Sequence, residues 1–281
     1  MRFLERLSND IKKNLLEELR VLWTHTSTSI EGNTLTLGET AFVLSEGLTI
    51  HGKPLKDHRD IQGHARAVDL LLGLVKKDQF TAQDIFDLHC LAIDEQILDV
   101  YKPVGAWKKE NNSTNIVFDG KQTIVEFSNY WEVPELMSRW LDLLNAEVQG
   151  RKTPEDVLRS YVRLHLSFIS IHPFWDGNGR IARLVSNLPC FKSGYPPIII
   201  EKEKRYEYIT AIADYQLANG VPSLKTHLVH EDSSSDKFYL ICKQGWEKSQ
   251  TLVEQAHNLQ QTRNNAVQKP SGSRGGENFT F

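Results

Sequence analysis

The 281-residue sequence has little cysteine, no long apolar run and no large excess of either charge. Its three cysteines are too few and too scattered for a disulfide framework or a zinc site, which favours a reducing compartment. No apolar run approaches the roughly 20 residues of a membrane span, and the N-terminus lacks the apolar core of a signal peptide. The net charge of −3 gives no basic domain of the kind that binds nucleic acids. We therefore expect a cytoplasmic protein that engages neither membranes nor nucleic acids.

Helical periodicity dominates the sequence. Apolar residues recur at helical spacing in residues 15–23, in residues 68–75 and in residues 80–97, where Thr81 is placed to cap the helix. Residues 157–171 are apolar on more than half of a helical circumference, which predicts a central buried helix. Thr153 and Pro154 give that helix an N-cap and a proline in its first turn.

Residues 115–127, NIVFDGKQTIVEF, break the helical pattern. Two β-branched runs flank Asp119-Gly120, a dipeptide suited to the positive φ angles of a tight turn, so we predict a β-hairpin here. Helices resume at about Val133. After residue 230 the composition predicts a linker in EDSSSDK, a partly amphipathic helix over residues 237–266 and a disordered tail over residues 269–281.

The most informative stretch is HPFWDGNGR, residues 172–180, which follows the central helix. Gly177 and Gly179 precede a new helix, expected from Arg180, and allow its free backbone N–H groups to approach an anion closely. Arg180 and Arg183 lie one helical turn apart and can clamp phosphate oxygens. These features predict a phosphate-binding loop.

Two further side chains supply reactive groups to this loop. Asp176 offers a carboxylate of the kind that holds Mg²⁺ together with phosphate oxygens. His172 is placed to take a proton from an attacking hydroxyl. Each group alone is typical of an ordinary turn or helix end, but a simple turn requires neither two arginines at helical spacing nor a histidine four residues before the aspartate.

HPFWDGNGRIAR resembles the signature of Fic-domain proteins, H-x-F-x-D/E-G-N-G-R-x-x-R, at every fixed position. The resemblance covers about residues 25–230, including LHCLAI, a turn at Gly105 and RYEYITAI. It implies an all-α Fic-fold helical bundle with a β-hairpin flap and a small C-terminal helical appendage. On this basis we divide the chain into an N-terminal helical region with an inhibitory helix (1–60), a Fic core (61–230) and a C-terminal segment (231–281).

The resemblance also implies an activity, the transfer of AMP from ATP to a Ser, Thr or Tyr hydroxyl of a target protein (AMPylation). By motif position, the implied roles are a general base for His172, the Mg²⁺ or Mn²⁺ ligand for Asp176, a core anchor for Phe174, an anion hole for Gly177, Asn178 and Gly179, a γ-phosphate clamp for Arg180, phosphate contacts for Arg183 and an adenine contact for Tyr208. The hairpin 115–127 would be the flap that aligns an unknown target protein by strand addition. Where the family often has G-x-x-R, Gly105 is followed here by Ala-Trp-Lys, which departs from the pattern for anchoring the flap.

STSIEGN, residues 27–33, resembles the Fic inhibitory motif, S/T-x-x-x-E-G/N, in the subclass that carries it N-terminal to the core. Ser27 and Glu31 share a helix face at i and i+4, and Gly32 can end the helix. An ordinary helix C-terminus would look similar, but a glutamate in the last turn opposes the helix dipole and so calls for a cationic partner. The implied partner is Arg180, and the pair would keep ATP from binding productively.

Two other functions remain open from the sequence. One is a protein de-AMPylase or a transferase of another phosphate-containing group, and the other is a non-catalytic nucleotide-binding interaction protein. Self-modification and a homodimer are compatible with either enzymatic hypothesis.

Overall fold

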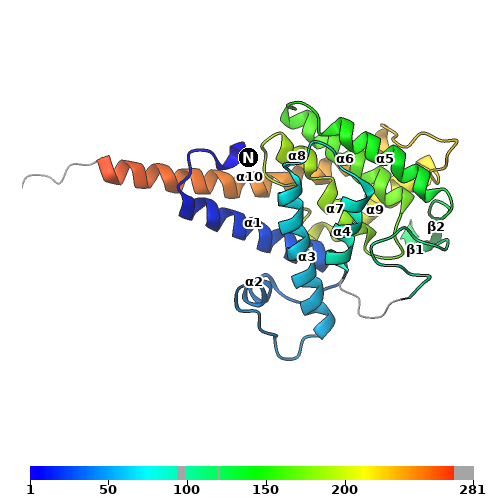
Figure 1. The fold of residues 1–281 in the computed structure, drawn as a ribbon, viewed down its shortest axis with the longest axis horizontal. Helices are drawn as coiled ribbons and strands as arrows, with labels where there is room; N and C mark the ends of the chain where they lie inside the picture. Colours follow the sequence, from blue (N-terminus) through cyan, green and yellow to red (C-terminus); the bar gives the residue numbers. More distant parts are fainter. Residues whose placement is uncertain (94–98, 119–120, 269–281) are drawn as a thin grey trace, which may run out of the picture.

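A computed structural model describes residues 1–268 except 94–98 and 119–120. The architecture is helical with one antiparallel hairpin in the described residues, which confirms the predicted fold class (Figure 1). In chain order the elements are η1 (Arg2–Leu4), α1 (Asn9–Ile30), α2 (Leu37–Glu46), α3 (Leu55–Leu74), α4 (Ala82–Ala92), β1 (Ser113–Phe118), β2 (Lys121–Glu126), α5 (Val133–Glu147), α6 (Pro154–Ile171), α7 (Asn178–Val185), α8 (Leu188–Lys192), η2 (Lys202–Lys204), α9 (Arg205–Asn219) and α10 (Ser233–Gln268).

Helix α6 is the centre of the molecule, as its two apolar stripes predict. It contacts α5, α7, α8, α9 and α10, and its side chains from Val157 to Ile171 are mostly buried. Thr153 and Asp156 form a capping box at its start, and Pro154 occupies the first turn. Because α6 is held on so many sides, the loop that leaves its C-terminus starts from a fixed point.

Helix α1 belongs to the main core rather than to a separate lobe. Leu15, Leu19 and Trp23 are buried in the same cluster as residues of α3, α5, α6 and α7. Figure 1 shows α1 and α10 side by side, reaching away from the body of the bundle, with the hairpin at the opposite end. The C-terminus of α1 therefore points into the bundle. The boundaries at residues 60 and 230 stay predictions.

The hairpin pairs β1 with β2 in the register Ser113↔Glu126 through Phe118↔Lys121, which confirms the predicted strands. The predicted Asp119-Gly120 turn lies outside the described residues. So does the predicted disordered tail, residues 269–281. In the part of the chain that is described, no helix has the length and apolar character needed to cross a membrane.

The sequence-based elements differ from the structure at several helices, including α4, α2 and α10. Helix α4 has the predicted cap, a box between Thr81 and Asp84, but ends at Ala92, and residues 94–97 of the predicted extension are outside the described part. Helix α2 was not predicted, although Thr36 and Glu39 form a capping box and Gly47 ends it in the left-handed conformation. Helix α10 begins at Ser233, inside the predicted linker, because the Asp232 carboxylate accepts hydrogen bonds from the backbone N–H groups of its first turn.

Candidate active site

The loop from α6 to α7 reverses the chain at two left-handed residues. His172 ends α6 with φ 54° and ψ 62°, and Gly177 precedes α7 with φ 78°. Helix α7 thus begins at Asn178, two residues earlier than predicted. The shift places the backbone of Asn178 and Gly179 in the first helical turn, where N–H groups lack intrahelical partners.

Neighbouring side chains lie close to both glycines, and Gly177 also has a positive φ of 78°. A Cβ at Gly177 would lie 2.4 Å from Cδ1 of Ile93, and a Cβ at Gly179 would lie 2.5 Å from Oε1 of Glu31. Phe174 is fully buried and anchors the loop, with its ring stacked on His89 at 3.7 Å between centroids. The loop is therefore anchored at Phe174, and its backbone at Gly179 lies directly against the Glu31 carboxylate.

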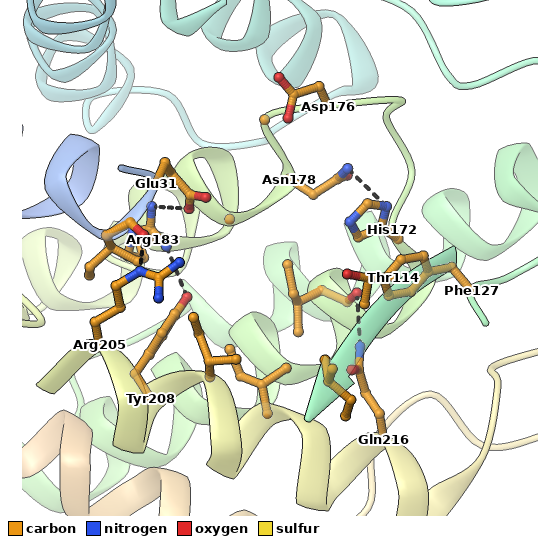
Figure 2. A pocket seen from close by; sticks show the side chains of 17 residues that line it. Glu31, Thr114, Phe127, His172, Asp176, Asn178, Arg183, Arg205, Tyr208 and Gln216 are labelled. Carbon is orange, nitrogen blue, oxygen red and sulfur yellow. Dashed lines mark hydrogen bonds and ion pairs between the residues drawn. The ribbon is translucent and has the colours of Figure 1, made fainter. Parts of the chain in front are cut away.

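A cavity of about 230 Å³ lies against this loop (Figure 2). It brings together nearly all of the site residues expected from the sequence, including residues that lie far apart in the chain. Its lining includes Glu31, His172, Asp176, Gly177, Asn178, Gly179, Arg183 and Tyr208, together with Thr114 and Ile116 of β1. Arg180 does not line it.

Glu31 pairs with Arg183. The prediction that it pairs with Arg180 is wrong. Arg183 Nη2 lies 2.7 Å from Glu31 Oε1 and also donates to the Ser27 carbonyl at 2.9 Å, while Nε donates to Ser27 Oγ at 3.0 Å. Ser27 and Glu31 thus hold one guanidinium from a single helix face. The physical reason is the direction of each arginine on α7, because only Arg183 faces the end of α1.

Arg180 faces the opposite way, toward α3 and α4. Its Nη1 donates to Asp60 Oδ1 at 3.1 Å and to the Ala92 carbonyl at 3.3 Å, and its Nη2 lies 3.4 Å from Asp176 Oδ2. Burial raises the pKa of Asp60, and the charge of Arg180 opposes that shift. Arg180 therefore links the loop and the Asp176 side chain to α3 and α4.

Tyr208, from α9, contacts Arg183 inside the cavity. Its hydroxyl accepts a hydrogen bond from Arg183 Nη1 at 3.1 Å and lies 2.9 Å from Nε2 of His165. Burial raises the pKa of Tyr208 to about 12, so the hydroxyl stays protonated. The adenine contact expected for this residue stays a prediction.

His172 presents its ring to the cavity from beside the hairpin. The ring stacks on Phe127, just after β2, with 3.7 Å between centroids and a 4° angle between planes. Burial, with a contribution from the charge of Lys108, lowers the pKa of His172 to about 3. The imidazole is therefore neutral near pH 7, as a proton acceptor must be.

Known proteins share both the sequence pattern and the fold. The Fic/DOC family model matches residues 79–190. "Protein adenylyltransferase fic-1" of Caenorhabditis elegans is 31% identical over 229 residues, 80% of this chain and 42% of the relative. "Protein adenylyltransferase Fic" of Culex quinquefasciatus is 33% identical over 196 residues, 69% of this chain and 36% of the relative.

Solved structures extend the similarity to most of the chain. A Fic domain containing signaling protein from Bacteroides thetaiotaomicron superimposes with a TM-score of 0.77 at 24% identity, covering 91% of this chain and 93% of that one. A fragment of Fic-1 from C. elegans gives 0.70 at 25% identity, covering 91% and 69%. The chain belongs to the Fic/DOC family. It spans about two fifths of the length of the curated fic-1 relatives.

Several residues of this Fic site were not singled out from the sequence. Asn112 contacts His172, and Lys108, only 2% exposed, donates to Asn112 Oδ1 at 2.6 Å. The Lys108 backbone N–H also donates to the Pro173 carbonyl at 2.8 Å, so the turn after Gly105 is tied directly to the loop despite its departure from G-x-x-R. Burial lowers the pKa of Lys108 to about 8. The sequence indicated a turn at Gly105, but it did not indicate which residues the segment after this turn contacts.

His89, in the LHCLAI segment, is a second residue that the sequence did not assign. Its Nε2 lies 3.0 Å from the Asp176 carbonyl and its Nδ1 accepts from the Gly105 N–H at 2.9 Å. Burial lowers the pKa of His89 to about 4. A neutral His89 thus links the Gly105 turn to the Fic loop.

Asp176 is the residue available to a metal ion. Its side chain is 62% exposed and lies on the cavity beside the glycine backbone. Among the described residues there is no group of three His, Cys, Asp or Glu side chains that could enclose a metal. That single carboxylate fits Mg²⁺, which usually keeps one or two protein carboxylates and completes its shell with phosphate oxygens and water.

Proposed function

We propose that this chain is an autoinhibited protein adenylyltransferase, which moves AMP from ATP to a Ser, Thr or Tyr hydroxyl of a target protein. The observation that carries the proposal is the ion pair of Glu31 and Arg183 inside the cavity that His172 and the Fic loop line. A guanidinium directed at an anion site is the group that would bind the terminal phosphate of ATP. Glu31 neutralises it and occupies the space beside Gly179.

The chemistry would follow from the placement of each group. The N–H groups of the first turn of α7 would hold phosphate oxygens, and Arg183, freed from Glu31, would hold the γ-phosphate. Mg²⁺ at Asp176 would neutralise phosphate charge when bound. His172 would take the proton of the acceptor hydroxyl, while its position next to the phosphates selects which phosphorus lies in line for attack.

The hairpin would position the acceptor hydroxyl of the target protein. A two-stranded sheet leaves one edge of each strand without a neighbouring strand, and an extended target segment can pair with such an edge through its main chain. Thr114 and Ile116 of β1 line the cavity, and Figure 2 shows Thr114 close to His172. A segment added to this flap would deliver a hydroxyl toward the imidazole.

Mass spectrometry of the Glu31→Gly protein incubated with Mg-ATP and cell lysate tests this function. The expected result is a mass gain of one AMP on a Ser, Thr or Tyr of a lysate protein or of the chain itself. A Glu31→Gly protein that folds, binds ATP and transfers nothing would contradict the proposal. Addition of a different phosphate-containing group would identify the alternative transferase.

Removal of AMP is a second candidate activity. The Glu31 side chain is 42% exposed at the cavity while its Oε1 is paired to Arg183. The other carboxylate oxygen is therefore able to orient a water molecule there. Incubating an AMP-modified protein with the parent chain and measuring released AMP tests this activity. A His172→Ala variant separates both enzymatic candidates from a nucleotide-binding interaction protein, because loss of a general base costs about a hundredfold or more in rate while a binder would be indifferent.

A further inference from the structure

Two side-chain amides meet the same nitrogen of His172. Asn178 Nδ2 lies 3.1 Å and Asn112 Nδ2 lies 3.2 Å from His172 Nδ1. Figure 2 shows the Asn178 contact and, on the other side of the ring, Nε2 directed into the cavity. An amide nitrogen donates two hydrogen bonds and accepts none. Whether Nδ1 carries a hydrogen or a free lone pair therefore depends on whether both amides turn their nitrogen toward it.

The Asn178 amide is fixed by the backbone of Phe174. Its Oδ1 accepts from the Phe174 N–H at 2.9 Å, and its Nδ2 donates to the Phe174 carbonyl at 2.8 Å. Exchanging the oxygen and nitrogen would place donor against donor and acceptor against acceptor at these two contacts. The partners therefore assign the nitrogen to the side facing His172.

The Asn112 amide is fixed by Lys108. The Lys108 ammonium has only donors, and it lies 2.6 Å from Asn112 Oδ1 in a buried position. The other end of the amide lies 3.4 Å from the carbonyls of Phe174 and Trp175, which accept hydrogen bonds. Both sides thus require oxygen toward Lys108 and nitrogen toward His172.

We propose that Asn112, pinned by Lys108, is a positioning residue that, with Asn178, holds His172 in the tautomer with hydrogen on Nε2. The nitrogen that faces the cavity is then a hydrogen-bond donor in the resting protein. Because both amides donate toward Nδ1, that nitrogen must be unprotonated and act as the acceptor. A neutral ring has one N–H, which is then on Nε2. The consequence for catalysis rests on the proposed function, whereas the tautomer itself does not.

This tautomer cannot act as the general base at Nε2, because that nitrogen has no free lone pair. Nε2 must first give its proton to water and Nδ1 must take one from water, and the Asn112 amide must rotate so that Oδ1 accepts the new N–H. The ring must also move off the Asn178 amide, which Phe174 keeps in place. Nε2 can then take the hydroxyl proton as the oxygen bonds to the α-phosphorus and pyrophosphate leaves. The protein would carry this restraint in addition to Glu31.

Nitrogen NMR of the apo protein tests the tautomer without any reference to activity. The chain is labelled with ¹⁵N-histidine, and the His172 signals are assigned by their absence from His172→Gln. At neutral pH we expect a pyridine-type shift for Nδ1 and a pyrrole-type shift for Nε2. The reverse pattern in the parent protein would overturn the proposal.

Substitutions at Asn112 and at Lys108 sharpen the test. Asn112→Asp replaces the donor by an acceptor and is expected to move the hydrogen to Nδ1. Asn115→Asp, which adds the same charge at an exposed position of β1, should leave the pattern unchanged. Lys108→Met should give a mixture of tautomers, and Lys108→Arg, which keeps a donor to Asn112, should retain the parent pattern. Equal spectra for Asn112→Asp and Asn115→Asp would contradict the assignment.

A kinetic arm tests the consequence in the Glu31→Gly background. Asn112→Asp is expected to raise kcat for AMP transfer about threefold or more while KM for ATP changes by less than about twofold, because only the base is altered. A switched tautomer with unchanged or lower kcat would overturn the catalytic consequence. Absence of AMP transfer in Glu31→Gly itself would count against the proposed function and leave the NMR result standing.

Discussion

Glu31 and Arg183 meet at 2.7 Å although 152 residues separate them in the chain. Arg183 is 2% exposed and Glu31 is 42% exposed, so the pair joins a buried cation to a carboxylate at the edge of the cavity. Arg183 keeps bonds to Ser27 and Tyr208 when the carboxylate leaves. The pair can therefore open without leaving the buried guanidinium unsatisfied.

Glu31→Gly should raise AMP transfer at least about tenfold, which corresponds to roughly 1.4 kcal/mol at the barrier. Removing the carboxylate releases Arg183 to the γ-phosphate and clears the space beside Gly179. Initial rates with labelled ATP measure the effect. Glu31→Gln, which keeps the volume and removes the charge, should give an intermediate gain, and Glu18→Ala, an exposed change on α1, should give none. Equal rates for Glu31→Gly and the parent would contradict inhibition by Glu31.

Arg183, rather than Arg180, should be the arginine that ATP requires. In the Glu31→Gly background, Arg183→Lys is expected to weaken ATP binding by about tenfold because an ammonium lacks the planar fork that holds two phosphate oxygens. Arg180→Lys should have a smaller effect on ATP affinity, since Arg180 is turned toward Asp60 and the Ala92 carbonyl. Isothermal titration with a non-hydrolysable ATP analogue compares the two. A larger loss at Arg180 would restore the assignment made from the sequence.

Gly177→Ala should destabilise the protein by about 1–2 kcal/mol or more, because an L-residue in the left-handed region is strained. The added Cβ would also meet Ile93 at 2.4 Å. Gly38→Ala is the matched control, since Gly38 lies in α2 with open space around its Cα and alanine is the better helix former. Urea unfolding of both variants measures the difference. A Gly177→Ala protein as stable as the parent would show that the loop relaxes without cost.

Stability should fall as the pH is lowered from about 6.5 toward about 3. Burial lowers the pKa of His64 to about 3, whereas an unfolded histidine titrates near 6.5. The unfolded chain therefore binds a proton that the folded protein excludes throughout this window, and each such histidine contributes up to about 1.4 kcal/mol per pH unit. His64→Gln should flatten the dependence, and His51→Gln, at an exposed position, should not. Urea unfolding at pH 7.5 and pH 5.5 tests both.

The sequence predicted the elements whose signals are local. Periodicity and capping residues placed α6 and its start at Thr153, and the β-branched runs placed the hairpin. The glycines and arginines of the Fic motif placed the phosphate loop in the right segment. Such features depend on residues within one or two turns of each other, which the printed sequence displays directly.

The partner of Glu31 could not be read in the same way. Arg180 and Arg183 lie one turn apart on α7, and their spacing does not say which of them faces α1. That direction is fixed by how α7 packs against α1, α3 and α4, which is a tertiary relationship. Asn112 and Lys108 were missed for the same reason, because the Asn112 contact to His172 spans 60 residues of chain and Lys108 reaches the loop at the distant Pro173 carbonyl.

The placement of Glu31 at the tip of α1 limits how an activator could work. The leucines of α1 belong to the main hydrophobic core, so removing the whole helix would unfold the protein. Under the proposed function, Arg183 would instead be released by a movement of the Glu31 side chain or by a competitor for its carboxylate, with α1 left in place. A regulatory protein or ligand would therefore be expected to bind near Gly32 and Asn33, where Asn33 Nδ2 donates to the Asp57 carbonyl of α3 at 2.8 Å.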